Sequence, residues 1–219
     1  MKICFLTKKE KKGVDEAIQY TYGLSENVDV FYGDLNIPIP EKVYMTKYDI
    51  LISYISPWIV PPKILNNTNK WNINFHPGPP AYPGIGCFNF AIYNSEDKFG
   101  ATAHIMQKKV DSGQIIGVEY FSMTNEETVE TLSIKTYNAQ LILYKNIINH
   151  IKNHDRLPSC IYSWERKPYR RIDLEELSKI NIDMPYTEIQ KRIRATYYPG
   201  KPAPFIKIGT SKFEYNPNR

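Results

Sequence analysis

Short apolar runs alternate with helix-like segments over residues 1–76, and this alternation restricts the possible folds more than any other feature of the sequence. The runs "KICFLT", "VDVFY", "ILISY" and "WNINFH" are rich in β-branched and aromatic residues, and a helix is expected near Val14–Leu24. Because "ILISY" is apolar along nearly its whole length, it suits a parallel strand that is covered on both faces. We therefore predict an α/β fold with a doubly wound, mostly parallel sheet.

The pattern changes after residue 100. Residues 101–106 and 115–121 are typical of antiparallel strands, so we expect the sheet to be mixed rather than wholly parallel. The sequence "TNEE" at Thr124–Glu127 has the spacing of a capping box, and we expect it to begin a long helix that ends near Ile151.

Prolines recur in the last part of the chain, between two short helical segments and a hairpin around Gly209. We therefore divide the chain into a main domain, residues 1–155, and a small C-terminal helix and hairpin extension, residues 156–219. The extension is too small for a strong core of its own, so it should pack on the main domain or on a second copy. Its sequence "PFIKIGTSKFEY" offers an apolar edge that favours a homodimer.

Composition limits the environment and the partners. Cys4, Cys87 and Cys160 lack metal-ligand spacing and are odd in number, which indicates a reducing compartment. No apolar run is long enough for a signal peptide or a membrane span, so we expect a cytoplasmic protein without membrane contact. The net charge of +5 fits either an anionic ligand or a lysine-rich proteome, and no basic-aromatic module for nucleic acid accompanies it.

The segment "NINFHPGPPAYPGIG" places Asn74 and His76 two residues apart at the end of a predicted strand, followed by a loop stiffened by prolines. Side chains two apart on a strand share a face, and α/β folds bind ligands at the carboxyl ends of such strands. There an imidazole can move a proton and an amide can stabilise an oxyanion. Asp111, in the connection of the next hairpin, could orient the imidazole. A turn-forming Asn, an ordinary histidine and a turn-starting Asp explain the same residues without catalysis.

The stretches "NINFHPGPPAYPGIG" and "GATAHIMQKKVDSGQII" resemble the N10-formyltetrahydrofolate-dependent formyltransferase family in amino-acid sequence. His76 and Asp111 also have the family's separation of about 35 residues. The resemblance covers residues 48–120 well. It implies a Rossmann-like fold and N10-formyltetrahydrofolate as co-substrate. It also implies that Asn74 polarises the formyl oxygen, that His76 moves the proton, and that Asp111 orients His76. The residues that it implies for cofactor binding are Ser53, Tyr54, Ile55, Ser56, Pro57, Ile85 and Asp111.

The sequences "WERKPYRRIDLEEL" and "RIRATYYPGKPAPFIKI" resemble the C-terminal segments of formyltransferases that act on nucleotide-linked amino sugars. This resemblance implies formylation of dTDP-4-amino-4,6-dideoxyglucose for O-antigen or a related glycan. Alternatives are a dTDP-3-amino sugar, a GDP- or UDP-linked amino sugar, or hydrolysis of formyltetrahydrofolate. The residues predicted to contact the sugar nucleotide are Pro83, Gly84, Trp164, Arg194, Tyr197, Tyr198 and Lys201.

A metal site is a further interpretation of His76, His104 and Asp111. No zinc-type spacing supports it, and His104 is more simply a residue of an alternating strand. We therefore predict no metal.

Overall fold

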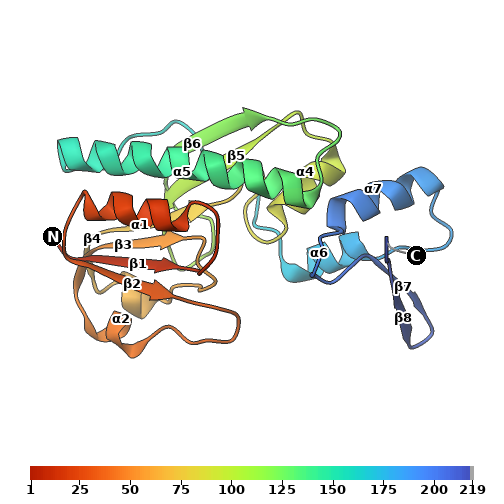
Figure 1. Ribbon diagram of the computed structural model, residues 1–219, viewed down its shortest axis with the longest axis horizontal. Helices are drawn as coiled ribbons and strands as arrows, with labels where there is room; N and C mark the ends of the chain where they lie inside the picture. The colour runs from red at the N-terminus through yellow and green to blue at the C-terminus, as the bar shows by residue number, and fades with distance from the viewer. Residues whose placement is uncertain (218–219) are drawn as a thin grey trace.

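The computed structural model describes residues 1–217 and contains a six-stranded sheet in the order β2-β1-β3-β4-β5-β6 (Figure 1). Strands β2, β1, β3 and β4 run parallel, whereas β5 is antiparallel to both β4 and β6. The prediction of a mixed, mostly parallel α/β sheet is confirmed. The strands are β1 (Ile3–Thr7), β2 (Val28–Tyr32), β3 (Tyr48–Tyr54), β4 (Thr68–His76), β5 (Lys98–Ile105) and β6 (Ile115–Ser122).

Helices cover both faces of the sheet, which is why its central strands are apolar. Along β1, Ile3 and Phe5 pack into a core with α1 (Val14–Tyr22) and α5 (Val129–His154). The alternating residues Cys4 and Leu6 pack on the other face, in a core with α2 (Glu41–Met45) and α3 (Pro62–Leu65). This two-sided burial accounts for the continuous apolar run that the sequence shows in β3.

The long helix begins later than its sequence predicts, so the expected start at Thr124 is wrong. Thr128 is the N-cap: its side-chain oxygen accepts from the Thr131 backbone N–H at 3.2 Å, and the Thr131 hydroxyl accepts from the Thr128 N–H at 2.9 Å. Glu127 instead turns its carboxylate toward Thr131 and Lys135. Two threonines therefore form the capping box that "TNEE" was expected to form.

The extension contains α6 (Arg171–Ser178), α7 (Tyr186–Thr196) and a hairpin of β7 (Phe205–Ile208) and β8 (Ser211–Glu214), as its sequence predicts. Figure 1 shows it at one end of the molecule, beside α4 (Cys87–Asn94). Leu177 and Ala195 of the extension share a buried cluster with Phe90 of α4 and with Leu132 of α5. The extension thus completes its core on the main domain. Within residues 1–217, no helix is long and apolar enough to cross a bilayer.

Candidate active site

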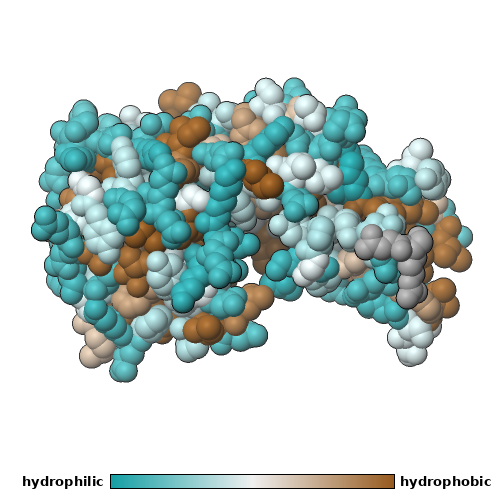
Figure 2. All heavy atoms as spheres, in the orientation of Figure 1, coloured by the Kyte–Doolittle hydropathy of each residue, from teal (hydrophilic) through white to brown (hydrophobic). Residues whose placement is uncertain are grey.

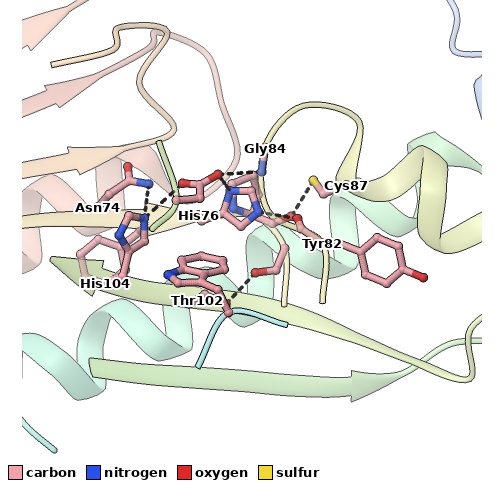
Figure 3. A network of polar contacts seen from close by, with 12 residues as sticks. Asn74, His76, Tyr82, Gly84, Cys87, Thr102 and His104 are labelled. Atoms are coloured by element: carbon pink, nitrogen blue, oxygen red, sulfur yellow. Dashed lines mark hydrogen bonds and ion pairs between the residues drawn. The ribbon is translucent and has the colours of Figure 1, made fainter. Parts of the chain in front are cut away.

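Asn74 and His76 lie at the carboxyl end of β4, on the same face of the strand (Figure 3). The His76 side chain is buried, and Asn74 is half-buried. Across the antiparallel pair with β5, Asn74 is opposite His104, and the Asn74 Nδ2 and His104 Nε2 atoms lie 3.0 Å apart. The register of two strands therefore brings one amide and two imidazoles together at one end of the sheet.

Asp111 lies between the two histidines. Its Oδ2 atom is 3.2 Å from His76 Nδ1, and its Oδ1 atom is 3.2 Å from His104 Nε2. The backbone N–H of Gly84 also donates to Oδ2, at 2.8 Å. The structure thus brings together the three residues predicted to be catalytic and adds His104, which the sequence had suggested was only a strand residue.

The Asp111 carboxylate is held in its charged form. Burial alone would raise its pKa, but the neighbouring imidazoles of His76 and His104 and the Gly84 N–H hold the pKa of Asp111 well below its usual range. Asp111 also has a positive φ of 42°, which is uncommon for a residue other than glycine. An ionised carboxylate in a buried position can fix the orientation of both imidazole rings.

Both ring nitrogens of His76 face an acceptor oxygen. Nδ1 faces Asp111, and Nε2 lies 2.9 Å from the carbonyl oxygen of Tyr82. An imidazolium with a proton on each nitrogen satisfies both contacts, whereas a neutral ring with its proton on Nδ1 would turn the Nε2 lone pair toward Tyr82. Because the Tyr82 carbonyl oxygen lies in front of Nε2, the ring must turn away from Tyr82 before Nε2 can take a proton from a substrate amine.

The proline- and glycine-rich loop is fastened tightly around His76. Thr102 donates from its hydroxyl to the Gly78 carbonyl at 2.7 Å, and Cys87 donates from its thiol to the Pro77 carbonyl at 3.2 Å. A Cβ atom on Gly78 would lie 2.6 Å from His76 Nε2, so this position requires glycine. Burial raises the pKa of Cys87 to about 12, which makes it a structural thiol rather than a nucleophile.

A small cavity of about 70 Å³ opens beside Asn74 and Asp111, on the side of the loop predicted to bind the cofactor. Its wall of Trp58, Ile59 and Val60 faces polar side chains, a combination that fits a flat ring with a polar edge. Two of the residues predicted to bind the cofactor, Ser53 and Asp111, line this cavity. The complete lining is Ser53, Trp58, Ile59, Val60, Asn74, His104, Met106, Gln107, Lys109, Val110 and Asp111.

The other residues predicted to bind the cofactor have different surroundings. Tyr54 is fully buried in the core, so only its backbone could reach a ligand. Ile55 has a positive φ of 53°, a strained conformation for a β-branched residue. The Ser56 side chain accepts from the Trp58 N–H at 3.2 Å, Pro57 packs near Gly33, and Ile85 is exposed.

A larger cavity, of about 500 Å³, lies between the main domain and the extension, where Figure 2 shows a hollow in the surface. Tyr198 and Lys201, which were predicted to bind substrate, line it. Four cationic and four aromatic side chains surround it with one carboxylate, and several hydroxyl and amide groups complete the wall. The cations are Lys11, Arg171, Lys201 and Lys212, the aromatics are Phe88, Tyr137, Tyr198 and Phe205, and the carboxylate is Glu175.

The remaining predicted substrate contacts lie outside this cavity. Arg194 donates to the backbone carbonyls of Asn125 and Ile92, which ties α7 to the main domain. The ring of Tyr197 packs edge-on against Tyr215 at 5.6 Å. Pro83 and Gly84 belong to the loop that holds Asp111, and Trp164 lies against the histidines, as described below.

Among residues 1–217, no group of three or more His, Cys, Asp or Glu side chains has the arrangement of a metal site. At the carboxyl end of a mostly parallel sheet, an ionised carboxylate, two imidazoles and an amide form an arrangement that can carry out acid–base group transfer. Residues 41–148, a little under half of the chain, match the family model described as formyl transferase, which indicates a formyl transferase domain in this part of the chain.

The curated relatives include GDP-perosamine N-formyltransferases of Brucella melitensis biotype 1 and Brucella abortus, each 25% identical over 165 residues. Each match covers 73% of this chain but only 61% of the relative. Among solved structures, a 4-N formyltransferase from Francisella tularensis has a TM-score of 0.77 at 20% identity and covers 98% of both chains. An N-formyltransferase from Helicobacter canadensis, solved with folinic acid and dTDP-3-aminofucose, has a TM-score of 0.75 at 20% identity and covers 97% of this chain and 86% of that one. These likenesses confirm the fold.

Proposed function

We propose that the protein transfers a formyl group from N10-formyltetrahydrofolate to the amino group of a nucleotide-linked amino sugar. The observation that carries this proposal is the convergence of Asn74, His76 and an ionised Asp111 at the carboxyl end of the sheet. The family match and the names of the Brucella relatives support the choice of reaction.

In this reaction the co-substrate supplies the formyl group, and the residues of this chain supply position and proton movement. The Asn74 amide donates a hydrogen bond to the formyl oxygen as negative charge develops there. His76 moves a proton at Nε2, while Asp111 keeps the proton on Nδ1 and balances the charge of the ring. Ser53 and the wall of Trp58, Ile59 and Val60 would hold the folate ring.

The acceptor that we favour is dTDP-4-amino-4,6-dideoxyglucose, whose formylated product would be used to build O-antigen or a related glycan. We also propose that this protein acts in the cytoplasm. The large cavity supports a nucleotide-linked acceptor: its cations can neutralise a diphosphate, and Tyr198 or Tyr137 can stack on a base. A GDP-linked 4-amino sugar is the second candidate, because the Brucella relatives carry GDP-perosamine in their names.

We further propose a homodimer formed through the terminal hairpin. A two-stranded hairpin is marginally stable alone, and this one exposes Ile208, Phe213 and Tyr215, at 62%, 56% and 38%. Figure 2 shows hydrophobic residues exposed at this end of the molecule. The solution mass of the full chain tests this directly: twice 25.5 kDa is expected, and a monomer at micromolar concentration would contradict it.

The function is tested with N10-formyltetrahydrofolate and a panel of dTDP-, GDP- and UDP-linked 3- and 4-amino sugars, by following folate release and product mass. We expect one added formyl group on the dTDP-4-amino sugar and none with His76→Ala. Formylation of GDP-perosamine alone would select the second acceptor. Release of formate without any sugar would replace the transferase by a formyltetrahydrofolate hydrolase, which needs the same three residues but uses water as acceptor.

A further inference from the structure

Trp164, in the extension, lies against both histidines that contact Asp111. Its ring centroid is 5.9 Å from that of His76 and 5.1 Å from that of His104, with interplanar angles of 71° and 82°. Both contacts are therefore edge-to-face, an arrangement that aromatic rings favour. One side chain from outside the sheet thus touches both imidazoles of the buried network.

Trp164 is fixed in this place by its own hydrogen bond. The indole N–H donates to the carbonyl oxygen of Gly113 at 2.8 Å, two residues after Asp111. Gly113 itself has no room for a side chain, because a Cβ atom there would lie 1.8 Å from the carbonyl oxygen of Ile105. The donor capacity of the indole is used inside the protein, so it is not available to a ligand.

The backbone that follows Trp164 is attached to the loop that follows His76. The Glu165 N–H donates to the Pro80 carbonyl at 3.2 Å, and the Tyr169 N–H donates to the Pro83 carbonyl at 2.9 Å. In return, the Ile85 N–H donates to the Tyr169 carbonyl at 3.0 Å. These bonds attach the segment that follows Trp164 to the loop whose Gly84 donates to Asp111.

An apolar ring in this position keeps water from the imidazole–carboxylate contacts. Hydrogen bonds to a charged group are stronger where the surroundings are apolar and water does not compete. Replacing a large side chain by alanine leaves a space that neighbouring groups fill only in part. Without the indole, water could reach His76 and His104, and both rings would gain room to turn away from Asp111.

We propose that Trp164 is a positioning residue, through which the extension keeps His76 and His104 dry and aligned on Asp111. This role deepens the formyl transfer proposed above and rests on it where turnover is the readout. It replaces the sequence-based expectation that Trp164 contacts the sugar nucleotide.

The kinetic test compares Trp164→Ala with Trp164→Phe, with Ile161→Ala as control. Ile161 is 97% exposed three residues away, and its replacement should leave both constants unchanged. Trp164→Ala should lower kcat about 100-fold, because a small misplacement of catalytic groups has effects of that size. KM for the sugar nucleotide should stay within about twofold, since no binding contact is lost. Trp164→Phe, which keeps an aromatic wall, should restore most of kcat.

Two kinetic results would reject the proposal. An increase in KM with unchanged kcat in Trp164→Ala would make Trp164 a ligand contact. An equal loss of kcat in both variants would assign the effect to the hydrogen bond with Gly113 rather than to the ring.

A second measurement does not depend on turnover. The chain has four histidines, and His150 and His154 lie near the end of α5, away from the site. Imidazole N–H protons of ¹⁵N-histidine-labelled protein should show slowly exchanging downfield signals from His76 and His104 in the wild type. These should broaden into exchange with water in Trp164→Ala and persist in Trp164→Phe, while His150 and His154 stay unchanged. Persistence in Trp164→Ala would refute the proposal even if no amino sugar were ever formylated.

Discussion

The sheet side and the extension side of the candidate active site are built from different contacts. On the sheet side, buried ionisable side chains contact one another: Asp111, His76 and His104 are each at most 5% exposed. On the extension side, backbone hydrogen bonds join two irregular segments, and one aromatic ring, that of Trp164, reaches the site. The comparison suggests that the sheet provides the chemistry and the extension sets its alignment.

The largest expected effect is on the sheet side. Asp111→Asn removes the charge that orients both imidazoles, and we expect kcat to fall about 10³- to 10⁴-fold, as for other orienting carboxylates. The KM for the folate should change little. The matched control is Asp173→Asn in the extension, whose carboxylate pairs with Arg170 near the surface. Equal losses in the two variants would remove the distinction between the two sides.

The part of this site that the sequence predicts is the part governed by local geometry. Asn74 and His76 share a face because strands have a period of two, and Asp111 follows in the connection of a predicted hairpin. His104 was underestimated because its position opposite Asn74 depends on the register between β4 and β5, which the hydrophobic pattern alone does not fix here.

Contacts between the extension and the main domain were the least predictable from the sequence. Trp164 and Gly113 are 51 residues apart and meet only because two irregular segments pair, and no periodic pattern marks such a pairing. Arg194 shows the converse, because its place in a basic segment gave no sign that its guanidinium would donate to the backbone carbonyls of Asn125 and Ile92. The alternation that predicts the six-stranded sheet carries no information about these contacts.

Gly84→Ala should cause the largest loss of stability, because Gly84 lies where the two sides meet. Its φ is +88°, and a Cβ atom would lie 2.3 Å from the Tyr169 carbonyl oxygen. Gly200→Ala is the control, since Gly200 has a φ of +73° with nothing within 4 Å of the added atom. The control should lose about 1–2 kcal/mol from backbone strain alone, and Gly84→Ala should lose at least about 2 kcal/mol more. Urea unfolding measures both losses. Equal losses would mean that the loop and the extension move apart to accommodate the added atom without a further loss of stability.

The stability that Asp111 contributes should depend on pH in a defined direction. Its pKa is lower in the folded protein than in the unfolded chain, where an aspartate has a pKa of about 3.9. Its contribution is therefore present above about pH 4 and is lost as the pH falls from there toward the folded pKa. The difference in unfolding free energy between wild type and Asp111→Asn should shrink as urea unfolding is repeated from pH 6 down to pH 3. A constant difference would show that the charge of Asp111 does not stabilise the fold.

The smallest effect that we predict concerns Gln140, a residue of α5 that hydrogen-bonds to the backbone of β4. Its buried side-chain N–H donates at 2.6 Å to the backbone carbonyl of Phe75, the residue between Asn74 and His76. Gln140→Leu keeps the side-chain volume but removes this donor, which should cost about 1–2 kcal/mol of stability. Because the bond restrains the backbone between the two residues that we propose to be catalytic, kcat should also fall, by about tenfold at most.

The control for Gln140 is Gln190→Leu on the exposed face of α7 in the extension, which should change neither quantity. A loss of stability in Gln140→Leu with unchanged kcat would show that the sheet holds Asn74 and His76 rigidly without help from α5. The position of β4 would then depend on its neighbouring strands and on the proline-rich loop alone. The contrast between the sheet side and the extension side would become sharper, because the positioning contact made from outside the charged network would then be that of Trp164 rather than that of Gln140.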